Sequence, residues 1–225
     1  MNGGARQLAL ELDHAESFAR DDFLGGPSNA AALTLIDSWP DWPGRIVALV
    51  GPEGSGKSHL ASVWAEQAGA RRVAARALGR TDVPAALATG ALVVEDAAAA
   101  GFDETAMFHL LNLAREEAAF VLLTARTAPA GWTARTPDLA SRLKALPVVA
   151  LAGPDHALLR AVLVKLFADR QLNVEESLIS YVTMRIERSF AAARAAVAML
   201  DAEALRTKRP LTRALAAELL RPGEP

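Results

Sequence analysis

Gly51-Pro-Glu-Gly-Ser-Gly-Lys57-Ser58 is the stretch of this sequence that decides its fold. The apolar run 46–50 precedes it, and a helical pattern that includes Leu60, Val63 and Trp64 follows it. A strand, a glycine-rich loop and a helix in this order form a P-loop, in which backbone N–H groups and a helix N-terminus bind a nucleotide phosphate. The sequence therefore predicts a nucleotide-binding site at this loop.

The polar side chains of the P-loop have separate predicted roles. Lys57 is expected to reach the β- and γ-phosphates, and the Ser58 hydroxyl is expected to ligate Mg²⁺. The glycines allow consecutive backbone N–H groups to converge on the phosphate oxygens. The residues predicted to surround the nucleotide at this loop are Gly51, Pro52, Glu53, Gly54, Ser55, Gly56, Lys57, Ser58 and His59.

Composition limits the class of protein. A chain of 225 residues is long enough for one large domain, or for one domain with a small appendage. No window approaches the roughly 20 apolar residues of a membrane span, and the N-terminus lacks a signal-peptide pattern, so we expect a cytoplasmic protein with no membrane partner. The chain has no cysteine and its four histidines are far apart, so the nucleotide's Mg²⁺ is the metal to expect. The net charge of −2 argues against broad affinity for nucleic acid.

Short apolar runs alternate with helical patterns from residue 46 to about 151. Strands are expected at 46–50, near Val73, and at 91–94, 120–124 and 148–151, with helices near 57–68, 82–88 and 104–117. This alternation predicts an α/β fold in which helices cover both faces of a parallel sheet and the nucleotide lies at the carboxyl ends of the strands.

The flanking segments complete three predicted parts. A short helix at 30–36 is expected to be capped by Ser28 or Asn29. After residue 153, apolar residues recur at intervals of three and four, which predicts a small all-α domain. We therefore expect an extended leader at 1–22, a base domain at 23–152 and a helical lid at 153–225.

Glu95 and Asp96 close the apolar run 91–94. Two acids at the end of a buried strand are typical of a Walker B motif, in which one carboxylate holds the Mg²⁺ shell and its neighbour polarises water. The alternative is that the two acids simply end a buried strand at the solvent. The P-loop upstream favours the catalytic interpretation, and it makes Ser58, Glu95 and Asp96 the predicted Mg²⁺ ligands.

These residues resemble the AAA+ ATPases of the DnaA family, and most closely its short Hda-like regulators, over nearly the whole chain. Besides the P-loop and Glu95-Asp96, the similar segments are Phe23-Leu-Gly-Gly-Pro-Ser-Asn29 and Asp138-Leu-Ala-Ser-Arg-Leu143. The resemblance implies a three-layer αβα base with a small helical lid, and it places Phe23 and Asn29 beside the nucleotide. It also implies that Arg142 is an arginine finger, donated to the ATP of a neighbouring molecule. The alternative is a solvated arginine on a short helix.

The leader carries a second similar segment, Gln7-Leu-Ala-Leu-Glu-Leu12. It looks like the peptide by which Hda-like regulators bind the sliding clamp, the β subunit of DNA polymerase III. Gln7 would supply a directional amide, and Leu8, Leu10 and Leu12 would fill an apolar pocket. DnaA continues past its lid into a DNA-binding domain that this sequence does not contain, so we expect contact with DNA only through the clamp.

The resemblance fails at the positions that sense phosphate. Arg126 stands near the place of an aspartate in DnaA, so Thr124 is the expected polar contact. In the lid, Ala191 stands at the position of the nucleotide-sensing arginine, with Arg188 and Arg194 about one turn away on either side. Arg188 is favoured over Arg194. These departures imply weak hydrolysis by this chain, with ADP or ATP held as a structural cofactor.

The implied function is regulatory inactivation of the replication initiator DnaA. The clamp-bound, nucleotide-bound chain would present Arg142 to ATP held by DnaA and accelerate its hydrolysis, which blocks renewed initiation. A homodimer is also expected from AAA+ surfaces.

Two other classes of protein remain open at this point. One is an autonomous ATPase, a helicase loader or short initiator, that binds DNA through Arg71, Arg72, Arg76 and Arg80; the negative net charge disfavours it. The other is a small-molecule kinase, which the ordinary apolar face of the lid helices disfavours.

Overall fold

The computed structural model describes residues 19–98 and 102–220, and the predicted clamp-binding peptide at 7–12 lies outside the described residues. In chain order the elements are η1 (Arg20–Asp22), α1 (Ala30–Asp37), β1 (Ile46–Val50), α2 (Lys57–Ala68), β2 (Arg71–Ala74), η2 (Ala75–Arg80), α3 (Val83–Leu87), β3 (Ala91–Glu95), α4 (Glu104–Glu116), β4 (Phe120–Ala125), η3 (Pro129–Gly131), α5 (Pro137–Lys144), β5 (Val148–Ala150), α6 (His156–Asp169), α7 (Glu176–Arg185), α8 (Phe190–Thr207) and α9 (Arg213–Leu219).

The strands form one parallel sheet in the order β2-β3-β4-β1-β5. β1 lies between β4 and β5, and its last residue, Val50, is in register with Ala125 and Ala150. Strands covered on both faces can be apolar throughout, and every residue of β1 is buried. β2 is an edge strand that begins with the exposed Arg71 and Arg72, which explains its weak apolar pattern. All five predicted strand positions are confirmed.

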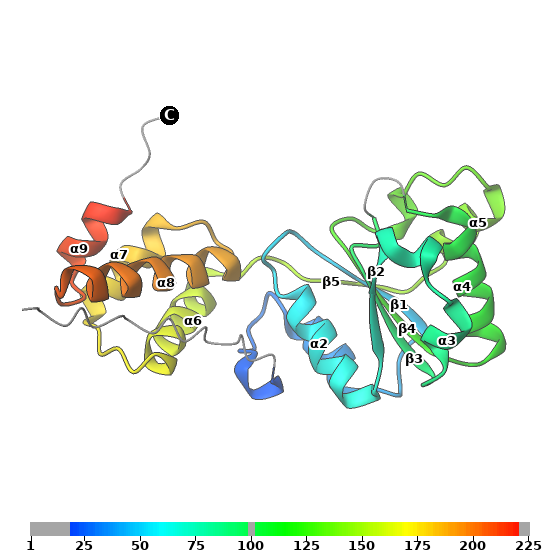
Figure 1. Ribbon diagram of the computed structural model, residues 1–225, viewed down its shortest axis with the longest axis horizontal. Helices are drawn as coiled ribbons and strands as arrows, with labels where there is room; N and C mark the ends of the chain where they lie inside the picture. The colour runs from blue at the N-terminus through cyan, green and yellow to red at the C-terminus, as the bar shows by residue number, and fades with distance from the viewer. Residues whose placement is uncertain (1–18, 99–101, 221–225) are drawn as a thin grey trace, which may run out of the picture.

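Alternate residues of β1 face two separate cores. Val47 and Leu49 pack with α1 and α2, whereas Ile46, Ala48 and Val50 pack with residues of α3, α4 and α5. Figure 1 shows the sheet nearly edge-on, with α2 on one side and α3, α4 and α5 on the other. The predicted three-layer αβα arrangement is therefore confirmed.

α1 begins where the sequence predicts, but neither expected residue caps it by its side chain. Asn29 occupies the N-cap position without a side-chain cap bond. Instead its Oδ1 accepts a hydrogen bond from the Gly26 N–H at 2.8 Å, and its Nδ2 donates to the Leu24 carbonyl at 3.0 Å. Among the residues that the structure describes, the buried Ser28 hydroxyl has no hydrogen-bond partner. Asn29 is thus the N-cap residue, as predicted, but its amide fixes the preceding loop instead of bonding a helix N–H.

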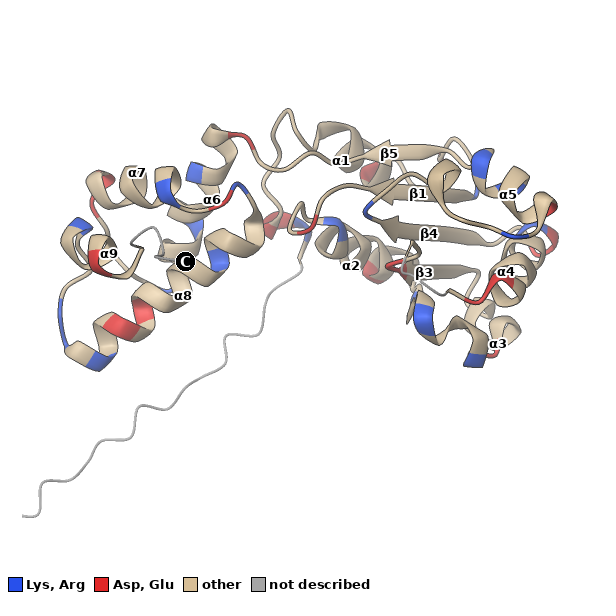
Figure 2. Cartoon of the chain, turned by 90° about the horizontal axis from the view of Figure 1, so that it is seen from above, with Lys and Arg blue, Asp and Glu red and all other residues tan. Residues whose placement is uncertain are grey.

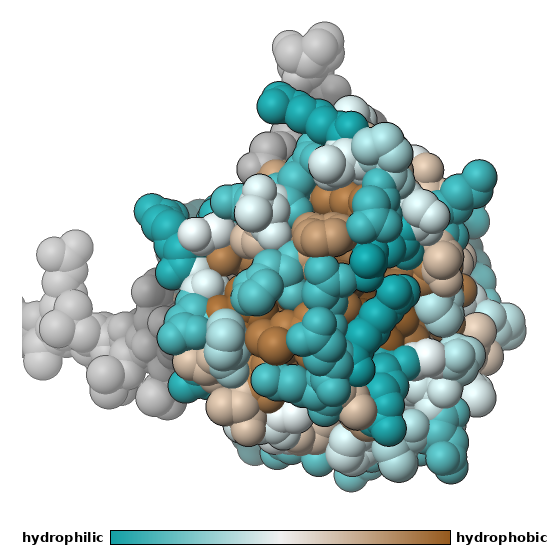
Figure 3. Space-filling model, turned by 90° about the vertical axis from the view of Figure 1, so that its right-hand side faces the viewer, coloured by the Kyte–Doolittle hydropathy of each residue, from teal (hydrophilic) through white to brown (hydrophobic). Residues whose placement is uncertain are grey.

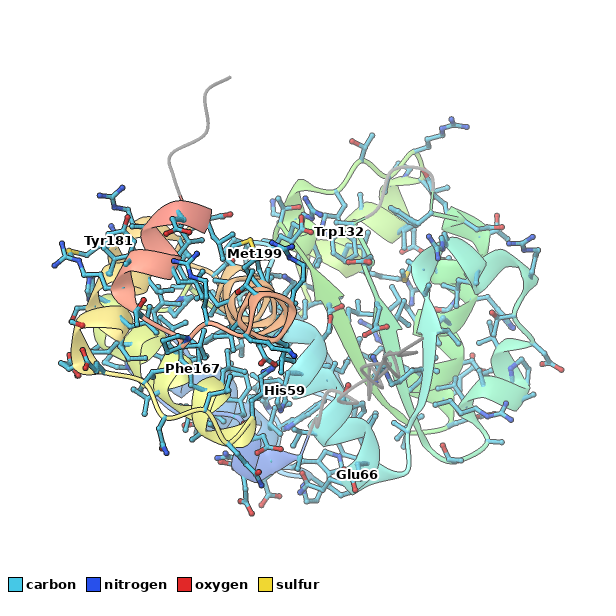
Figure 4. All side chains as sticks on the ribbon, turned by 60° about the vertical axis from the view of Figure 1, so that its left-hand side comes forward. His59, Glu66, Trp132, Phe167, Tyr181 and Met199 are labelled. Atoms are coloured by element: carbon cyan, nitrogen blue, oxygen red, sulfur yellow. The ribbon has the colours of Figure 1, made fainter. Side chains whose placement is uncertain are left out.

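Helices α6 to α9 pack around a core of their own, as the helical pattern predicts. Phe167 of α6 lies inside this lid, whereas Tyr181 of α7 lies at its outer end (Figure 4). The other buried members include Leu163, Leu178 and Val197. Among residues 19–98 and 102–220, no helix is long and apolar enough to cross a bilayer.

The lid contacts the base near the P-loop. The N–H of Phe190, the first residue of α8, donates to the Gly54 carbonyl at 2.9 Å. The ring centroids of Phe190 and Phe23 are 6.2 Å apart. On the same side of the lid, Lys165 Nζ of α6 lies 2.8 Å from the Asp22 carboxylate of η1. The P-loop therefore lies at the junction of the two domains.

Candidate nucleotide-binding site

The P-loop runs from β1 to α2 through glycines that no other residue replaces easily. Gly54 and Gly56 have φ values of +70° and +98°, in the left-handed region that favours glycine. A Cβ at Gly51 would lie 2.3 Å from the Leu151 carbonyl oxygen. These constraints bring the loop backbone to the N-terminus of α2, where free N–H groups attract an anion.

Lys57 is buried and bonded to its own loop. Its Nζ donates to the Gly51 carbonyl at 2.9 Å and to the Pro52 carbonyl at 2.7 Å. Burial lowers the pKa of Lys57; the charge of Asp96 opposes this shift, while that of Arg126 adds to it. The negative charge near the ammonium is therefore too small to offset its burial. Phosphate oxygens would supply the additional negative charge.

Two hydroxyls complete the loop. Ser55 Oγ is buried and has no hydrogen-bond partner within residues 19–98 and 102–220, and Ser58 is exposed in the first turn of α2. A buried polar atom without a partner is uncommon and indicates a missing ligand or water. The residues present thus fit a nucleotide phosphate with Mg²⁺, for which Lys57 and Ser58 would supply the cation and the hydroxyl ligand.

Asp96 follows β3 in a left-handed conformation, with φ of +54°. Its N–H donates to the Oγ1 of Thr124 at 3.2 Å, and Thr124 is buried at the end of the neighbouring strand β4. The Thr124 carbonyl accepts from the Ala97 N–H at 2.8 Å. Thr124, the predicted polar contact, therefore holds the backbone that carries the exposed carboxylate of Asp96.

Glu95 has a different environment from Asp96. Its carboxylate accepts a hydrogen bond from the Arg72 guanidinium of β2 at 2.8 Å. The same guanidinium donates to Ser62 Oγ of α2 at 2.7 Å. Glu95 thus links β3 to β2 and α2. Of the two acids, Asp96 is the one whose charge raises the pKa of Lys57, which favours Asp96 over Glu95 as the acid that acts at the phosphate site.

Aromatic rings occupy the junction beside the P-loop. The Phe23 ring meets His59 of α2 edge-on at 5.2 Å between centroids, and His59 Nε2 lies 3.1 Å from the Ala19 carbonyl. A Cβ at Gly56 would lie 2.8 Å from the Phe23 ring. Figure 4 shows His59 at the place where the lid meets the base. Phe23 therefore lies between Gly56 of the loop and His59 of α2, whereas the buried Asn29 hydrogen-bonds the backbone of Leu24 and Gly26.

The lid residues around Ser189 bear on the predicted phosphate sensors. The ideal Cβ of Gly54 would lie 2.8 Å from the Ser189 Cβ and 3.3 Å from the Ala191 Cβ. Ala191, at the position of the family's sensing arginine, thus faces the loop. Arg188 is exposed immediately before Ser189, and Arg194 is partly buried one turn further along α8 and has an interaction partner.

An ion pair spans the P-loop and the end of β4. Arg126 follows β4 directly, and its Nη2 donates to Glu53 Oε2 at 2.5 Å. The two side chains are 66% and 74% exposed. Each of them also acts electrostatically on Lys57, so the pair lies within reach of its ammonium.

Arg142 lies on α5, at the end of the base domain opposite the lid (Figures 1 and 2). Its guanidinium donates to Asn112 Oδ1 at 2.5 Å and to the Asp138 carboxylate at 3.3 Å. It also lies 4.8 Å from the centre of the Phe108 ring, and the side chain is 25% exposed. Arg142 is thus not part of this chain's own P-loop site, and three groups of the same chain hold it.

Some residues of this site do not stand out in the sequence. Ser189 has the N-cap signature of α8, and its Oγ accepts from the Ala192 N–H at 3.0 Å. Its contact with Gly54 crosses between domains, however, and no local pattern predicts it. The same holds for Phe190 against the loop and for the Asn112 contact of Arg142. The sequence predicts the nearness of Glu53 and Arg126 in part, because both residues follow predicted strands whose carboxyl ends lie at the same edge of the sheet.

No family model matches this sequence, and no curated protein matches it closely. Solved structures do match. Domain III of the Thermotoga maritima replication initiation protein DnaA has a TM-score of 0.74 at 18% identity, and the match covers 92% of this chain and 96% of that one. The AMPPCP-bound DnaA of Aquifex aeolicus gives 0.67 at 17% identity, covering 87% and 69%. A variant of Thermotoga maritima RuvB gives 0.68 at 16% identity, covering 90% and 71%.

The chain has the fold of DnaA domain III. At these identities the likeness concerns the fold alone, and it confirms the predicted base with a parallel sheet followed by a helical lid.

Proposed function

We propose that this chain binds an adenine nucleotide, ADP or ATP with Mg²⁺, between its base and its lid. The observation that carries the proposal is the connection of the P-loop to both domains. The buried Lys57 ammonium donates to the Gly51 and Pro52 carbonyls of the loop, and the Gly54 carbonyl of the same loop accepts the Phe190 N–H of the lid. A nucleotide in this loop would contact both domains, as a structural cofactor does.

The finer proposal is that the chain regulates DnaA through Arg142. Two findings support it. The fold is that of DnaA domain III over nearly the whole of that domain. Arg142 lies on α5, which is at the end of the base domain opposite the lid, so a nucleotide reached by its guanidinium would belong to another molecule. In this proposal the chain hydrolyses its own ATP weakly, and the ATP that is hydrolysed is the one bound to DnaA.

The contacts of Arg142 set a condition on that role. The guanidinium has to leave Asn112 and Asp138 before it can reach a partner's triphosphate. The Asp138 carboxylate is 62% exposed, and exposed ion pairs contribute only about 0.2–1 kcal/mol. A triphosphate carries several negative charges and competes well with such a pair.

The surface around α5 is suited to contact with a soluble partner. Figure 3 views the end of the base that carries α4 and α5, and it shows apolar patches divided by hydrophilic side chains. Figure 2 shows acidic and basic residues interspersed there. A mixed surface of this kind is compatible with an interface that forms and dissociates, since such interfaces are about as apolar as the rest of a protein surface.

The test is the hydrolysis of DnaA-bound ATP in the presence of clamp-loaded DNA. Wild-type chain should accelerate it, and Arg142→Ala should remove most of the acceleration, because arginine fingers contribute on the order of 10³–10⁵ in rate elsewhere. Arg135→Ala is the matched control, since its side chain is exposed just before α5. Equal stimulation by wild type and Arg142→Ala would reject the finger.

The proposed clamp contact is tested separately. Gln7→Ala with Leu8→Ala should abolish retention of the chain on immobilised sliding clamp, because the directional amide and one apolar anchor are lost. Undiminished retention would reject the peptide at 7–12 as the docking segment.

A second candidate is an autonomous AAA+ ATPase acting on DNA, which the similarity to the RuvB fold favours. Its proposed arginine run is partly used inside the chain, since Arg71 donates to the Ala85 carbonyl and Arg72 pairs with Glu95. Arg76 and Arg80 are exposed. Salt-dependent DNA binding by the isolated chain would favour this candidate over the DnaA regulator.

A further inference from the structure

One face of α4 holds α5 at two places. Glu104, Phe108 and Asn112 are four residues apart in turn, so they lie on the same side of the helix. Glu104 bonds the segment that leads into α5, and Asn112 bonds Arg142 near the end of α5. The Phe108 ring also contacts the Arg142 guanidinium. The two helices are neighbours at this end of the base (Figures 1 and 2), and this face of α4 therefore bears on where Arg142 lies.

The Glu104 carboxylate binds the backbone at the start of α5. Its two oxygens accept the Arg135 N–H at 3.1 and 3.0 Å, and one of them also accepts the Thr136 hydroxyl at 3.3 Å. Thr136 is the N-cap residue of α5, and its side chain makes no cap bond to the helix. Hydrogen bonds to a charged group are stronger than those between neutral groups, so this carboxylate fixes the point at which α5 begins.

The contact of Asn112 is lost in the proposed reaction. Its amide oxygen accepts the Arg142 guanidinium, which has to leave before it can reach a partner's triphosphate. Within the part of the chain that the structure describes, the polar contacts between α4 and residues 135–144 are those of Glu104 and Asn112. Once Arg142 turns outward, Glu104 therefore provides the polar contact that remains.

Apolar packing defines the direction of α5 less sharply. Leu139 and Leu143 of α5 are buried in the core that also contains Met107 and Leu110 of α4. Burial of this kind is non-directional, whereas a hydrogen bond restricts the separation and the angle of the groups that it joins. A displacement of about 1 Å of a group that acts on a reacting atom can lower a rate by about 10². The contact of Glu104 therefore matters to a guanidinium that acts on phosphate.

We propose that Glu104 is a positioning residue for Arg142, because it holds the start of α5 on α4 so that the released guanidinium points to the nucleotide of the partner. This inference rests on the proposed function of Arg142. Glu104 does not touch the nucleotide and acts through the position of α5.

The test measures the hydrolysis of DnaA-bound ATP on clamp-loaded DNA as a function of the concentration of this chain. Glu104→Ala should lower the maximum rate by about ten- to hundred-fold, because α5 loses its directional contact. Glu104→Gln should stay within about three-fold of wild type, since an amide oxygen still accepts the Arg135 N–H. The matched control is Glu116→Ala, at the exposed last residue of the same helix, and it should behave as wild type.

A purely structural role of Glu104 predicts a different result. A smaller folded fraction would raise the concentration needed for half of the maximum rate and leave the maximum itself unchanged. α4 should persist in Glu104→Ala, because Asp103 Oδ1 still caps it by accepting the Ala106 N–H at 2.9 Å and alanine favours a helix. An equal maximum rate for Glu104→Ala and wild type would overturn the inference. Absence of stimulation by the wild type would reject the proposed function itself.

Hydrogen exchange of the chain alone tests the contact without DnaA. The Arg135 amide should exchange about three-fold faster or more in Glu104→Ala, because its acceptor is lost, and it should stay protected in Glu104→Gln. Equal exchange of this amide in Glu104→Ala and wild type would overturn the inference whether or not the chain acts on DnaA.

Discussion

Lys57 illustrates how a functional residue differs from one that stabilises the fold. A buried ammonium bonded only to carbonyl oxygens loses hydration that two hydrogen bonds do not replace. Its pKa is accordingly lowered, mainly by burial. Without a bound nucleotide, the loop therefore holds this charge at a cost in stability, which a phosphate would offset.

Replacing Lys57 with methionine should raise the free energy of unfolding of the nucleotide-free chain by about 0.5–2 kcal/mol at neutral pH, because the penalty of the buried charge is removed. A lowered pKa means that the folded chain releases this proton before the unfolded chain does, so wild-type stability rises with pH in that window. The difference between Lys57→Met and wild type should then shrink as pH approaches the ordinary lysine pKa of about 10.4.

Denaturant unfolding at the two pH values measures this difference. A variant that is less stable than wild type at neutral pH would show that the ammonium stabilises the empty loop, contrary to this account.

Gly54 belongs to the P-loop and also contacts the lid, through the start of α8. Alanine there would be strained at φ of +70° and would place its Cβ 2.8 Å from the Ser189 Cβ. Gly69 ends α2 at φ of +61°, and a Cβ there would meet nothing within 4 Å. The two glycines therefore separate backbone strain from contact with the lid.

Gly69→Ala should cost roughly 1–2 kcal/mol of stability from the left-handed backbone alone. Gly54→Ala should cost that amount plus about 1–3 kcal/mol for the forced contact, and it should weaken nucleotide binding as well. Denaturant unfolding and calorimetry measure both effects. If the two variants lose equal stability and bind nucleotide equally well, then α8 does not press on the loop.

At the scale of elements, one ion pair joins the lid to η1, which is itself tied to α1 of the base by the pair of Arg20 with Asp37. Lys165 of α6 pairs with Asp22 of η1 at 2.8 Å and with Asp169 of its own helix at 2.9 Å. Both acids raise the pKa of Lys165, with Asp22 the larger contributor. Asp22 therefore links two domains, whereas Asp169 stabilises a single helix.

Asp22→Asn should loosen the lid by about 0.2–1 kcal/mol, the usual contribution of a partly exposed pair, and it should speed amide exchange in α6. Asp169→Asn keeps the interdomain contact and is the matched control. Hydrogen exchange of α6 in low and high salt measures the effect. Equal exchange in the two variants would show that Lys165 does not hold the domains together.

The strand and helix positions of the base follow closely from the sequence because local forces decide them. Runs that are buried on both faces, such as 46–50, and a glycine loop before a helix leave few alternatives. The sequence also locates Asn29 at the N-cap of α1, but it does not show that the Asn29 amide bonds the loop before the helix, because several nearby backbone donors and acceptors compete for it.

The residues of the candidate site fall into two groups, those that the sequence identifies and those that only the packing brings together. Lys57, Ser58 and Asp96 belong to motifs with fixed spacing, so the sequence identifies them. Contacts that join distant segments, such as Phe190 with Gly54 or Arg142 with Asn112, depend on how the domains and helices pack. No spacing in the sequence encodes such contacts, and only the structure brings them to light.

At the scale of the whole molecule, the central claim is that a nucleotide at the P-loop joins base and lid. Ligands that bind only the folded state stabilise it by an amount that grows with their concentration, about 2.7 kcal/mol at one hundred times Kd. If the ligand contacts both domains, this stabilisation should extend to the lid as well as to the loop that binds the phosphate.

Hydrogen exchange of the wild-type chain with and without Mg-ADP tests this most directly. The account predicts slower exchange in two segments, the P-loop and first turn of α2 at 54–60 and the start of α8 at 189–193, and no change in either segment of Lys57→Ala. Slower exchange at 54–60 alone, with the start of α8 unchanged, would contradict it.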